Sequence, residues 1–566
     1  MKVEKPTKKP MGFSIKLNNG TTLKIEKKGS PEPPKEEPKP EIKSEPSPPK
    51  EQPKPVTPPE SPKEEPKPAE VNAKEPKPAE VKPKEQKVEK KNSSDNLNKP
   101  EKTEKVEKQE AEKKDDDEEE EKYEGEILEE TRKKHLNIEF IGHVDAGKST
   151  LCGHILYLAG IVDQRTIEKF QREAQAKGRG SWYYSWVMDL SDSEREKGKT
   201  EEVGIANFET EVQKYTILDA PGHRSYVPQM IGGAAQADVA VLVISARKGE
   251  FETGIGGGQT SEHLLIAKTA GVRYVIIVVN KMDEKDIHDP DPTWSKQRFD
   301  EIVTKFTPFI TNEIQFKPDQ FCYIPIAALD GGNIKERSPN CPWYKGPTLF
   351  EALDAIPPPP RNEQDAFRLP VTDRYKAKNV MASGKIEMGV IHEGSKIMVM
   401  PSRAHGQILG IFVEENKIRK GVPGDNIRVS IAGLELSDLA PGSVLCKEDD
   451  PCHISQYAVG KLKLTTGAGN FITKGFSAVC HIHTKVTGVK FVKLMKAISP
   501  GKPPVENPKF VAEGQFVTAV LEFDEPICLE KYKDFPQMGR FIIRHNDATI
   551  GVGVIESIVN KKGPKE

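Results

Sequence analysis

The sequence predicts a multidomain chain in which an α/β domain of the P-loop class is preceded by a long disordered tail and followed by an all-β region. Three features carry this prediction: 47 prolines and 30% charged residues among 566, a glycine-rich loop between an apolar strand and a helix, and short alternating strands after residue 360. The length alone exceeds that of one compact domain, which usually has about 100–200 residues.

The predicted tail covers residues 1–134 and consists mainly of Lys, Glu and Pro. It repeats EPKPAEV at 65–71 and 75–81 and has no aromatic residue between Phe13 and Tyr123. Such a composition buries too little apolar surface to offset an ordering entropy of ~1–2 kcal/mol per residue. The seven consecutive acids of 115–121 repel one another, so we expect a solvated spacer there.

One short segment of the tail has a different pattern. Apolar residues alternate from Phe13 to Leu17, Asn19-Gly20 favours a tight turn, and Leu23 and Ile25 alternate again, which predicts a β-hairpin. An isolated hairpin is only marginally stable in water. We therefore expect these residues to bind the sheet edge of another protein.

Charge and cysteine usage limit the class of protein. With 85 basic and 87 acidic residues the formal charge is -2, so no global field attracts nucleic acid or an anionic membrane. The seven cysteines form no C-x-x-C pair, which favours a reduced, cytoplasmic setting. No apolar stretch approaches the ~18–20 residues that span a bilayer, so no membrane partner is expected.

The α/β domain is predicted from a strand at 136–141, a loop, and a helical pattern from Leu151. The loop has the spacing G-x-x-x-x-G-K-[ST], in which backbone N–H groups wrap phosphates, the lysine reaches the outer phosphates and the hydroxyl binds magnesium. Its residues are Gly142, His143, Val144, Asp145, Ala146, Gly147, Lys148, Ser149 and Thr150.

Two further motifs follow predicted strands. Asp219 and Gly222 end the strand 215–218, where Asp219 can hold a magnesium-bound water and the Gly222 N–H can meet a γ-phosphate. Asn280-Lys281-Met282-Asp283 follows the strand 275–279. A carboxylate at Asp283 accepts from guanine N1–H and the 2-amino group, whereas adenine leaves it unpaired. The three motifs in this order predict a GTP-binding domain with magnesium.

Two other segments complete the expected site. Thr200 ends a polar segment, 192–200, and is either the second magnesium hydroxyl or an ordinary loop threonine. After the strand 321–326 come Ala327, Ala328 and Leu329, whose backbone N–H groups can meet guanine O6.

With these motifs, the chain resembles the translational GTPases, and most closely the GTP-binding subunit of the eukaryotic peptide-chain release factor. The matching stretches cover roughly 135–558. They are GHVDAGKST, EREKGKTEEVG, DAPGHRSYVPQMIGGAAQADVAVLVISARKGEFETG, GGQTSEHLLIAKTAGV, NKMD, CPWYKG and ICLEKYKDFPQMGRF.

The resemblance implies a GTP-binding domain at 135–358 and two β-barrels, at 359–450 and 451–566. The sequence after 357–360 agrees independently, because short alternating strands separated by Gly and Pro turns are predicted there. They lie at 397–400, 407–413, 426–431, 478–483, 516–523 and 540–544.

The resemblance also implies a function. It makes the chain a ribosome-dependent GTPase that binds a class I release factor, through the second barrel, and couples hydrolysis of GTP to GDP to termination at stop codons. It gives Lys148, Ser149 and Thr200 phosphate and magnesium roles. It makes His223 the catalytic residue that positions the attacking water.

Two departures from the family pattern matter. Family members usually carry serine where this chain has Ala327, so a side-chain hydroxyl is absent at the base site. Some animal relatives bind poly(A)-binding protein through a phenylalanine-anchored peptide. Because no aromatic lies between Phe13 and Tyr123, poly(A)-binding protein is a doubtful partner here.

Three alternatives stay open at this point. A ribosome-rescue GTPase that partners a release-factor-like protein has the same domain plan. An elongation factor that carries aminoacyl-tRNA would favour a more basic chain than one with charge -2. In a GTP-gated scaffold, the tail would act and hydrolysis would be vestigial.

Overall fold

The computed structural model describes residues 13–16, 22–25, 133–189, 192–197, 199–255, 258–284, 293–359, 361–414, 416–465 and 471–559. The chain divides into two units, one formed by Met1–Ile25 with Glu118–Glu566 and the other by Glu26–Asp117, and every described residue belongs to the first. The expected repeats and the acidic run of the tail lie outside the described residues.

The hairpin predicted near the start of the chain is present. Strands β1 (Phe13–Lys16) and β2 (Thr22–Ile25) pair antiparallel, with Phe13 opposite Ile25. The alternation of apolar residues on both sides of Asn19-Gly20 was the signal for this pairing.

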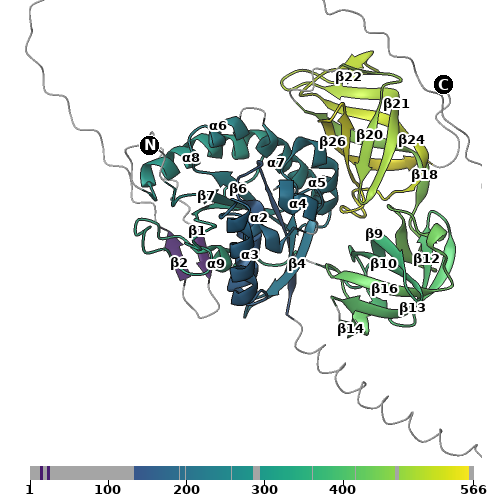
Figure 1. Ribbon diagram of the computed structural model, residues 1–566. Helices are drawn as coiled ribbons and strands as arrows, with labels where there is room; N and C mark the ends of the chain where they lie inside the picture. Colours follow the sequence, from purple (N-terminus) through teal and green to yellow (C-terminus); the bar gives the residue numbers. More distant parts are fainter. Residues whose placement is uncertain are drawn as a thin grey trace, which may run out of the picture. The chain divides into compact units, whose positions relative to one another are not determined.

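A six-stranded sheet forms the centre of the α/β domain, in the order β4-β5-β3-β6-β7-β8 (Figure 1). All neighbours are parallel except β4 and β5, which are antiparallel. The strands are β3 (His135–Gly142), β4 (Gly204–Glu209), β5 (Lys214–Asp219), β6 (Val239–Ser245), β7 (Tyr274–Asn280) and β8 (Phe321–Pro325). The parallel strands therefore bring all three predicted motifs to one edge.

Helices cover both faces of this sheet. Leu264 and Ile302, from α7 and α8, share one apolar core with Ile231 of α5, while Leu151 of α2 and Leu353 of α9 belong to the core on the other face. The helices are α2 (Lys148–Leu158), α3 (Gln164–Ala176), α4 (Asp192–Lys197), α5 (Val227–Ala234), α6 (Glu250–Ile255), α7 (Gln259–Ala270), α8 (Lys296–Pro308) and α9 (Leu349–Asp354). Short helical turns are η1 (Ser185–Val187), η2 (Arg224–Tyr226), η3 (Phe309–Glu313) and η4 (Leu436–Asp438).

Two closed antiparallel sheets follow, each of seven strands. The first has the order β12-β17-β9-β10-β16-β13-β14 and closes through β12–β13; the second has the order β20-β25-β26-β18-β24-β21-β22 and closes through β20–β21. Closure of the sheet on itself makes each a barrel, from which only the short strands β14 and β22 extend with one neighbour each. Two small pairs, β11–β15 and β19–β23, accompany them.

The strands of the first barrel region are β9 (Arg368–Lys376), β10 (Val380–Lys385), β11 (Ile391–His392), β12 (Lys396–Met400), β13 (Ala404–Val413), β14 (Asn416–Ile418), β15 (Lys420–Gly421), β16 (Asn426–Ala432) and β17 (Val444–Lys447). Those of the second are β18 (Ile454–Leu464), β19 (Ile472–Thr473), β20 (Ser477–Ile482), β21 (Lys485–Ile498), β22 (Val505–Glu506), β23 (Phe510–Val511), β24 (Phe516–Cys528), β25 (Arg540–His545) and β26 (Ala548–Val559). The predicted α/β domain with two all-β barrels is confirmed.

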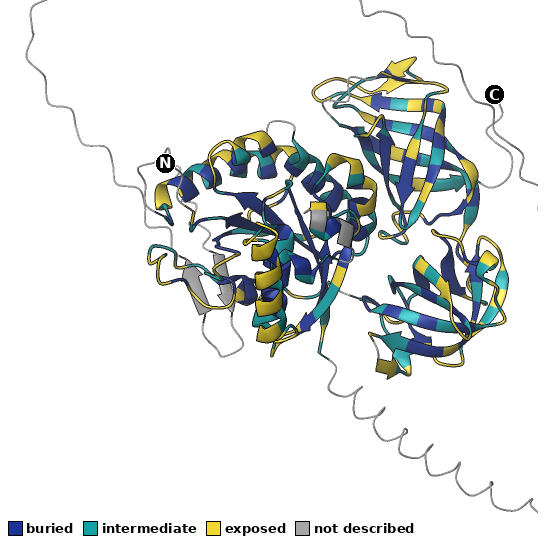
Figure 2. Cartoon of the chain, viewed as in Figure 1, coloured by how far each residue is buried: buried dark blue, intermediate teal, exposed yellow. Residues whose placement is uncertain are grey.

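The two kinds of sheet differ in burial, as Figure 2 shows. Every residue of β6 is buried, because helices cover both faces of a parallel sheet. In β16, by contrast, buried and partly exposed residues alternate, because only one face points into the barrel. Among the described residues, no helix is long and apolar enough to cross a membrane.

Candidate functional site

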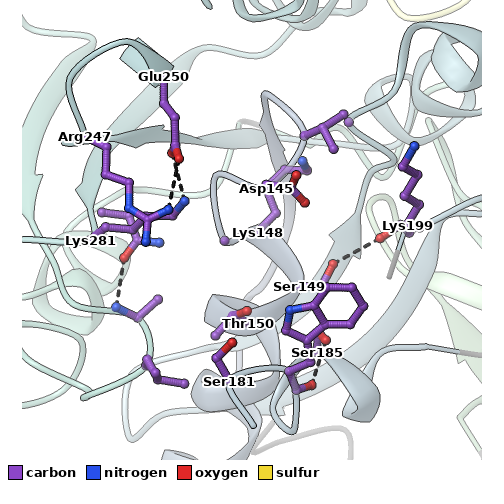
Figure 3. Close-up of a pocket in the computed structure, with 18 of the residues that line it drawn as sticks. Asp145, Lys148, Ser149, Thr150, Ser181, Ser185, Lys199, Arg247, Glu250 and Lys281 are labelled. Carbon is purple, nitrogen blue, oxygen red and sulfur yellow. Dashed lines mark hydrogen bonds and ion pairs between the residues drawn. The ribbon is translucent and has the colours of Figure 1, made fainter. Parts of the chain in front are cut away.

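A pocket of about 420 Å³ lies where the parallel strands of the α/β domain end (Figure 3). It is lined by fourteen of the residues predicted from the sequence: Val144, Asp145, Gly147, Lys148, Ser149, Thr150, Thr200, Gly222, His223, Asn280, Lys281, Asp283, Ala328 and Leu329. Five predicted residues do not line it, namely Gly142, His143, Ala146, Asp219 and Ala327. Seven residues that were not predicted also line it: Ser181, Trp182, Ser185, Lys199, Arg247, Glu250 and Glu284.

The loop between β3 and α2 needs its two glycines for close contacts. A Cβ on Gly142 would lie 2.3 Å from the Val243 carbonyl oxygen, and one on Gly147 would lie 2.3 Å from the Asn280 side chain. Both glycines have positive φ, 142° and 96°, which other residues rarely adopt. The spacing of the motif therefore follows from the space available in the folded domain.

Lys148 is buried at the start of α2 and its ammonium faces the loop. Nζ donates to the carbonyl oxygens of Gly142 at 3.1 Å and His143 at 2.9 Å. Burial lowers the pKa of Lys148, and the nearby Asp219 carboxylate opposes this. The cation is thus held at the position from which a phosphate-binding lysine acts.

The two predicted magnesium hydroxyls meet although they lie 51 positions apart. Ser149 Oγ and Thr200 Oγ1 are 3.1 Å apart. Behind them Asp219 is fully buried, and within the described part of the chain neither of its carboxylate oxygens has a hydrogen-bond partner. Burial raises the pKa of Asp219 to about 6, although the Ser149 hydroxyl and the Lys148 charge act in the opposite direction.

An orphaned buried carboxylate beside two hydroxyls suits a hard divalent cation. In the described part of the chain, no three His, Cys, Asp or Glu side chains are arranged to hold a metal by themselves. Magnesium usually keeps several waters and shares phosphate oxygens with its protein ligands. The residues present therefore fit magnesium bound together with a nucleotide.

A second, partly buried carboxyl, Asp189, lies near Asp219 at this end of the pocket. Burial, together with the charges of Asp219 and Glu194, raises the pKa of Asp189 to about 7. Glu194 itself accepts from the backbone N–H groups of Glu201 and Glu202, just after Thr200. These bonds join helix α4 to the residues that follow Thr200. The sequence predicted only a polar segment at 192–200 and no helix within it.

His223 caps the short turn η2, and its Nδ1 accepts from the Ser225 N–H at 3.3 Å. The residue before it, Gly222, lies so close to the phosphate loop that a Cβ would meet Lys148 Nζ at 2.5 Å. His223 therefore lines the pocket directly after the residue that lies beside the phosphate-binding lysine.

At the opposite end, Asn280 joins two loops that are far apart in the sequence. Its Nδ2 donates to the Ala146 carbonyl oxygen at 2.8 Å, and its Oδ1 accepts from the Ala328 N–H at 2.9 Å. Asp283 is half-buried, and burial raises the pKa of its carboxyl. A partly buried carboxylate in this position favours a ligand that offers it two donors.

The loop at 327–329 differs from the expectation in one respect. We expected the N–H groups of both Ala328 and Leu329 to be available, but that of Ala328 is used by Asn280. Ala327 is buried, and its N–H faces the Gly332 carbonyl oxygen at 3.3 Å. Among the described residues, the Leu329 N–H has no partner in this loop, which leaves it for a ligand.

A group of ion pairs flanks the base end and was missed by the sequence analysis. Lys281 Nζ lies 2.8 Å from Glu250 Oε2, and Arg247 pairs with both Glu250 and Glu284. Burial by itself would raise the pKa of Glu250, but hydrogen bonds from Lys281, Ser245 and Arg247 outweigh it and lower this pKa to about 2. Figure 3 shows Arg247, Glu250 and Lys281 together at one side of the pocket.

Ser181, Trp182 and Ser185 form another wall that carried no recognisable sequence signal. Their segment packs tightly on helix α2, since a Cβ on Gly153 would lie 2.0 Å from the Tyr184 carbonyl oxygen. Arg179 stacks over the Trp182 ring at 4.5 Å. Only the tertiary packing brings these residues to the pocket.

Models of three protein families match the chain. Residues 133–359 match the elongation factor Tu GTP binding domain, 379–446 match elongation factor Tu domain 2, and 464–556 match the GTP-eEF1A C-terminal domain-like family. The three matches fall on the α/β domain and on the two barrel regions.

Among curated proteins, the chain is similar to two described as eukaryotic peptide chain release factor GTP-binding subunit. Those from Candida maltosa and Candida albicans are each 44% identical over 438 residues, which is 75% of this chain. The chain spans about three-fifths of the length of these relatives, since the matches cover 60% of each.

A solved structure is also similar. The S. cerevisiae Ski7 GTPase-like domain, bound to GTP, has a TM-score of 0.63 at 19% identity; the match covers 76% of this chain and 98% of that one. At this identity the likeness shows the fold alone.

Proposed function

Because the chain belongs to the family of the eukaryotic peptide chain release factor GTP-binding subunits, we propose that it is a GTPase that serves translation termination. The observation that carries the proposal is a single pocket that combines a phosphate loop, the paired hydroxyls of Ser149 and Thr200, and the Asn280 to Asp283 motif. The first two suit a magnesium-bound triphosphate, and the third suits guanine.

The proposed phosphate contacts are those of the loop 142–150, with Lys148 on the outer phosphates and the Gly222 N–H on the γ-phosphate. Ser149 and Thr200 would hold magnesium, with Asp219 bound through a water. When bound, magnesium neutralises the charge that develops on the phosphates. His223 orients the attacking water, because it lines the pocket directly after Gly222, which lies beside Lys148.

Thr200 makes the site a switch. Its hydroxyl is 3.1 Å from the Ser149 hydroxyl, so these two residues would hold magnesium together with a triphosphate, and the segment 192–200 and the residues after Asp219 would then be ordered. Hydrolysis removes the γ-phosphate and releases both segments. The bonds from Glu201 and Glu202 to Glu194 link this change to helix α4.

The partners follow from the relatives' description. We propose that the GTP-bound chain presents a class I release factor to a cytoplasmic ribosome stopped at a stop codon, and that the barrel of 451–566 binds this factor. The hairpin β1–β2 is a binding segment for a further protein. The class I factor, and not this chain, would cleave the ester of peptidyl-tRNA.

GTP turnover, measured with purified chain alone, with ribosomes, and with ribosomes plus class I release factor, tests the proposal. We expect turnover to rise only in the last case. A rate that stays flat would favour a scaffold, and capture of charged tRNA by the GTP-loaded chain would favour an elongation factor.

The substitution His223→Ala tests the catalytic assignment. Stimulated turnover should fall by about two powers of ten or more, since general catalysis by one positioned side chain contributes about 10²–10⁴-fold, while GDP affinity stays unchanged. His405→Ala is the matched control, because His405 is an exposed barrel residue that pairs with Glu448. If the His223 variant keeps its stimulation, another group positions the water.

A further inference from the structure

His154 connects the phosphate-binding helix to the loop at the base end, and nothing in the proposed site uses it. It lies on α2, six residues after Lys148, and its side chain is buried. Its Nδ1 is 2.7 Å from the Ala328 carbonyl oxygen. Since a carbonyl oxygen only accepts, Nδ1 carries the proton and donates to it.

The rest of the ring is held in place as well. Tyr184 stacks on it with ring centres 4.1 Å apart, and the Tyr184 hydroxyl lies 3.3 Å from Nε2. With the proton on Nδ1, Nε2 of the neutral ring is the acceptor. A Cβ on Gly331 would lie 2.9 Å from the imidazole, so the ring also packs directly against the base-end loop.

The Ala328 carbonyl and the Leu329 N–H belong to the same peptide unit. A trans peptide is planar, and its C=O and N–H point in opposite directions. When His154 fixes the carbonyl, the Leu329 N–H must therefore point away from the ring. Leu329 lines the pocket, and its N–H is the donor that Asn280 leaves available.

We propose that His154 is a positioning residue for guanine, which orients the Ala328–Leu329 peptide so that the Leu329 N–H donates to the 6-oxo group of the base. A bond to the carbonyl also polarises the N–H of the same peptide and strengthens it as a donor. Because α2 begins with Lys148, one rigid helix then sets the distance between the phosphate contacts and this base contact. The inference rests on the proposed base site.

The test compares two diphosphates that differ at the 6-position of the base. GDP has the 6-oxo group and a proton on N1, whereas 2-aminopurine riboside 5′-diphosphate carries hydrogen at the 6-position, has no proton on N1 and keeps the 2-amino group, so the readout is the change that each variant makes to the affinity for each nucleotide. The variant His154→Phe keeps an aromatic ring against Tyr184 but removes the donor. We expect GDP affinity to fall about five- to tenfold, as for one hydrogen bond, with affinity for the 2-aminopurine nucleotide changed by less than about twofold.

Two further variants separate positioning from packing. The amide nitrogen of His154→Asn can take the place of Nδ1, so GDP affinity should be largely restored. Tyr184→Phe keeps the stacked ring and removes only the hydroxyl, so it should leave the preference for GDP unchanged. An equal loss of both nucleotides in His154→Phe, no loss of GDP, or no recovery in His154→Asn would overturn the inference.

Asp283→Asn distinguishes failure of this inference from failure of the proposed base site. The asparagine should shift the preference from GDP to xanthosine diphosphate, whose 2-oxo group accepts a hydrogen bond. If that variant still prefers GDP, the assignment of Asp283 to the base site is wrong, and the role of His154, which depends on that site, is wrong as well. If the preference shifts while His154→Phe weakens both purine nucleotides equally, only the inference about His154 is wrong.

Discussion

The two ends of the pocket are built in different ways. The phosphate end is built mainly on one run of consecutive residues, 142–150, whose glycines and lysine are required within one loop, with Thr200 reaching it from a distant segment. The base end is assembled by side chains that bridge distant segments, above all Asn280 between Ala146 and Ala328. A substitution in the phosphate loop should therefore affect mainly the contact of the substituted residue. A substitution of a bridging side chain at the base end should alter both of the loops that it joins.

Lys148→Ala should weaken nucleotide binding more than any substitution at the base end. It removes a cation that the structure holds by two carbonyl oxygens, and charge-assisted bonds are worth about 1.5–3 kcal/mol each. We expect GDP and GTP affinity to fall by about two to three powers of ten in titration calorimetry. The ratio of GDP to inosine diphosphate affinity should stay constant, because the base end is intact.

A change in that ratio would mean that the two ends are not separable. Thermal unfolding of Lys148→Ala is the control for folding, since a cooperative transition shows that the loss of affinity does not come from unfolded protein.

Asn280→Ala tests the bridged end and should cost less. Two hydrogen bonds are lost, each worth about 1 kcal/mol, so GDP affinity should fall about 30-fold. The phosphate loop loses its bond at Ala146 and the base-end loop loses its bond at Ala328. The rate constant of nucleotide dissociation, measured by stopped flow, should therefore rise. Asn280→Asp keeps the acceptor for the Ala328 N–H but repels the Ala146 carbonyl, so it should retain more of the preference for guanine than alanine does.

If the aspartate and alanine variants lose the preference for guanine equally, the bond to Ala328 contributes nothing to base selection. The base end would then depend on Asp283 alone.

The same contrast explains what could be predicted from the sequence. The phosphate loop and the strand before it are local, so residue spacing was sufficient to identify them. The ion pair of Lys281 with Glu250 spans 31 positions and the bond of His154 to Ala328 spans 174. No periodicity reports such pairs, because they depend on how β6, β7 and α2 are placed in the fold.

The barrels show a second reason for missed elements. Strand β21 runs from Lys485 to Ile498, yet none of it was predicted. Its register with β24 shifts between Phe491 and Lys493 and again between Leu494 and Lys496. Each bulge breaks the period of two on which the prediction of strands depends. The evenly alternating β16, in contrast, was predicted almost to its ends.

Glu139→Gln tests the strand beneath the phosphate loop. Glu139 is fully buried in β3, and neither of its oxygens has a hydrogen-bond partner in the part of the chain that the structure describes. Burial raises the pKa of this carboxyl well above its ordinary value, so the folded state favours the neutral acid. Because this carboxyl ionises more easily in the unfolded chain than in the folded one, the free energy of unfolding falls as the pH rises from the pKa of the unfolded chain to that of the folded chain.

The glutamine variant should therefore equal the native chain in stability near pH 4.5 and exceed it by about 1–3 kcal/mol at pH 8. Chemical denaturation at the two pH values measures this difference. Glu139→Leu, which has no polar atom to bury, should be more stable than the native chain at both. A difference between the glutamine variant and the native chain that does not grow with pH would show that Glu139 finds a partner when ionised.

Ala327→Ser should have the smallest effect on nucleotide affinity. It tests whether a side-chain hydroxyl at this position adds a contact at the base end. Ala327 is buried two residues after the end of β8, and serine adds one hydroxyl next to the loop that is proposed to bind the base. A typical net hydrogen bond is worth about 1 kcal/mol, and a serine hydroxyl at this fully buried position is expected to gain somewhat less, so GDP affinity should rise about threefold to fivefold in calorimetry. Ala327→Val adds similar bulk without the hydroxyl and should not improve affinity. No gain with serine would mean that the bridges of Asn280, and not the side chain at 327, limit how well this end holds a base.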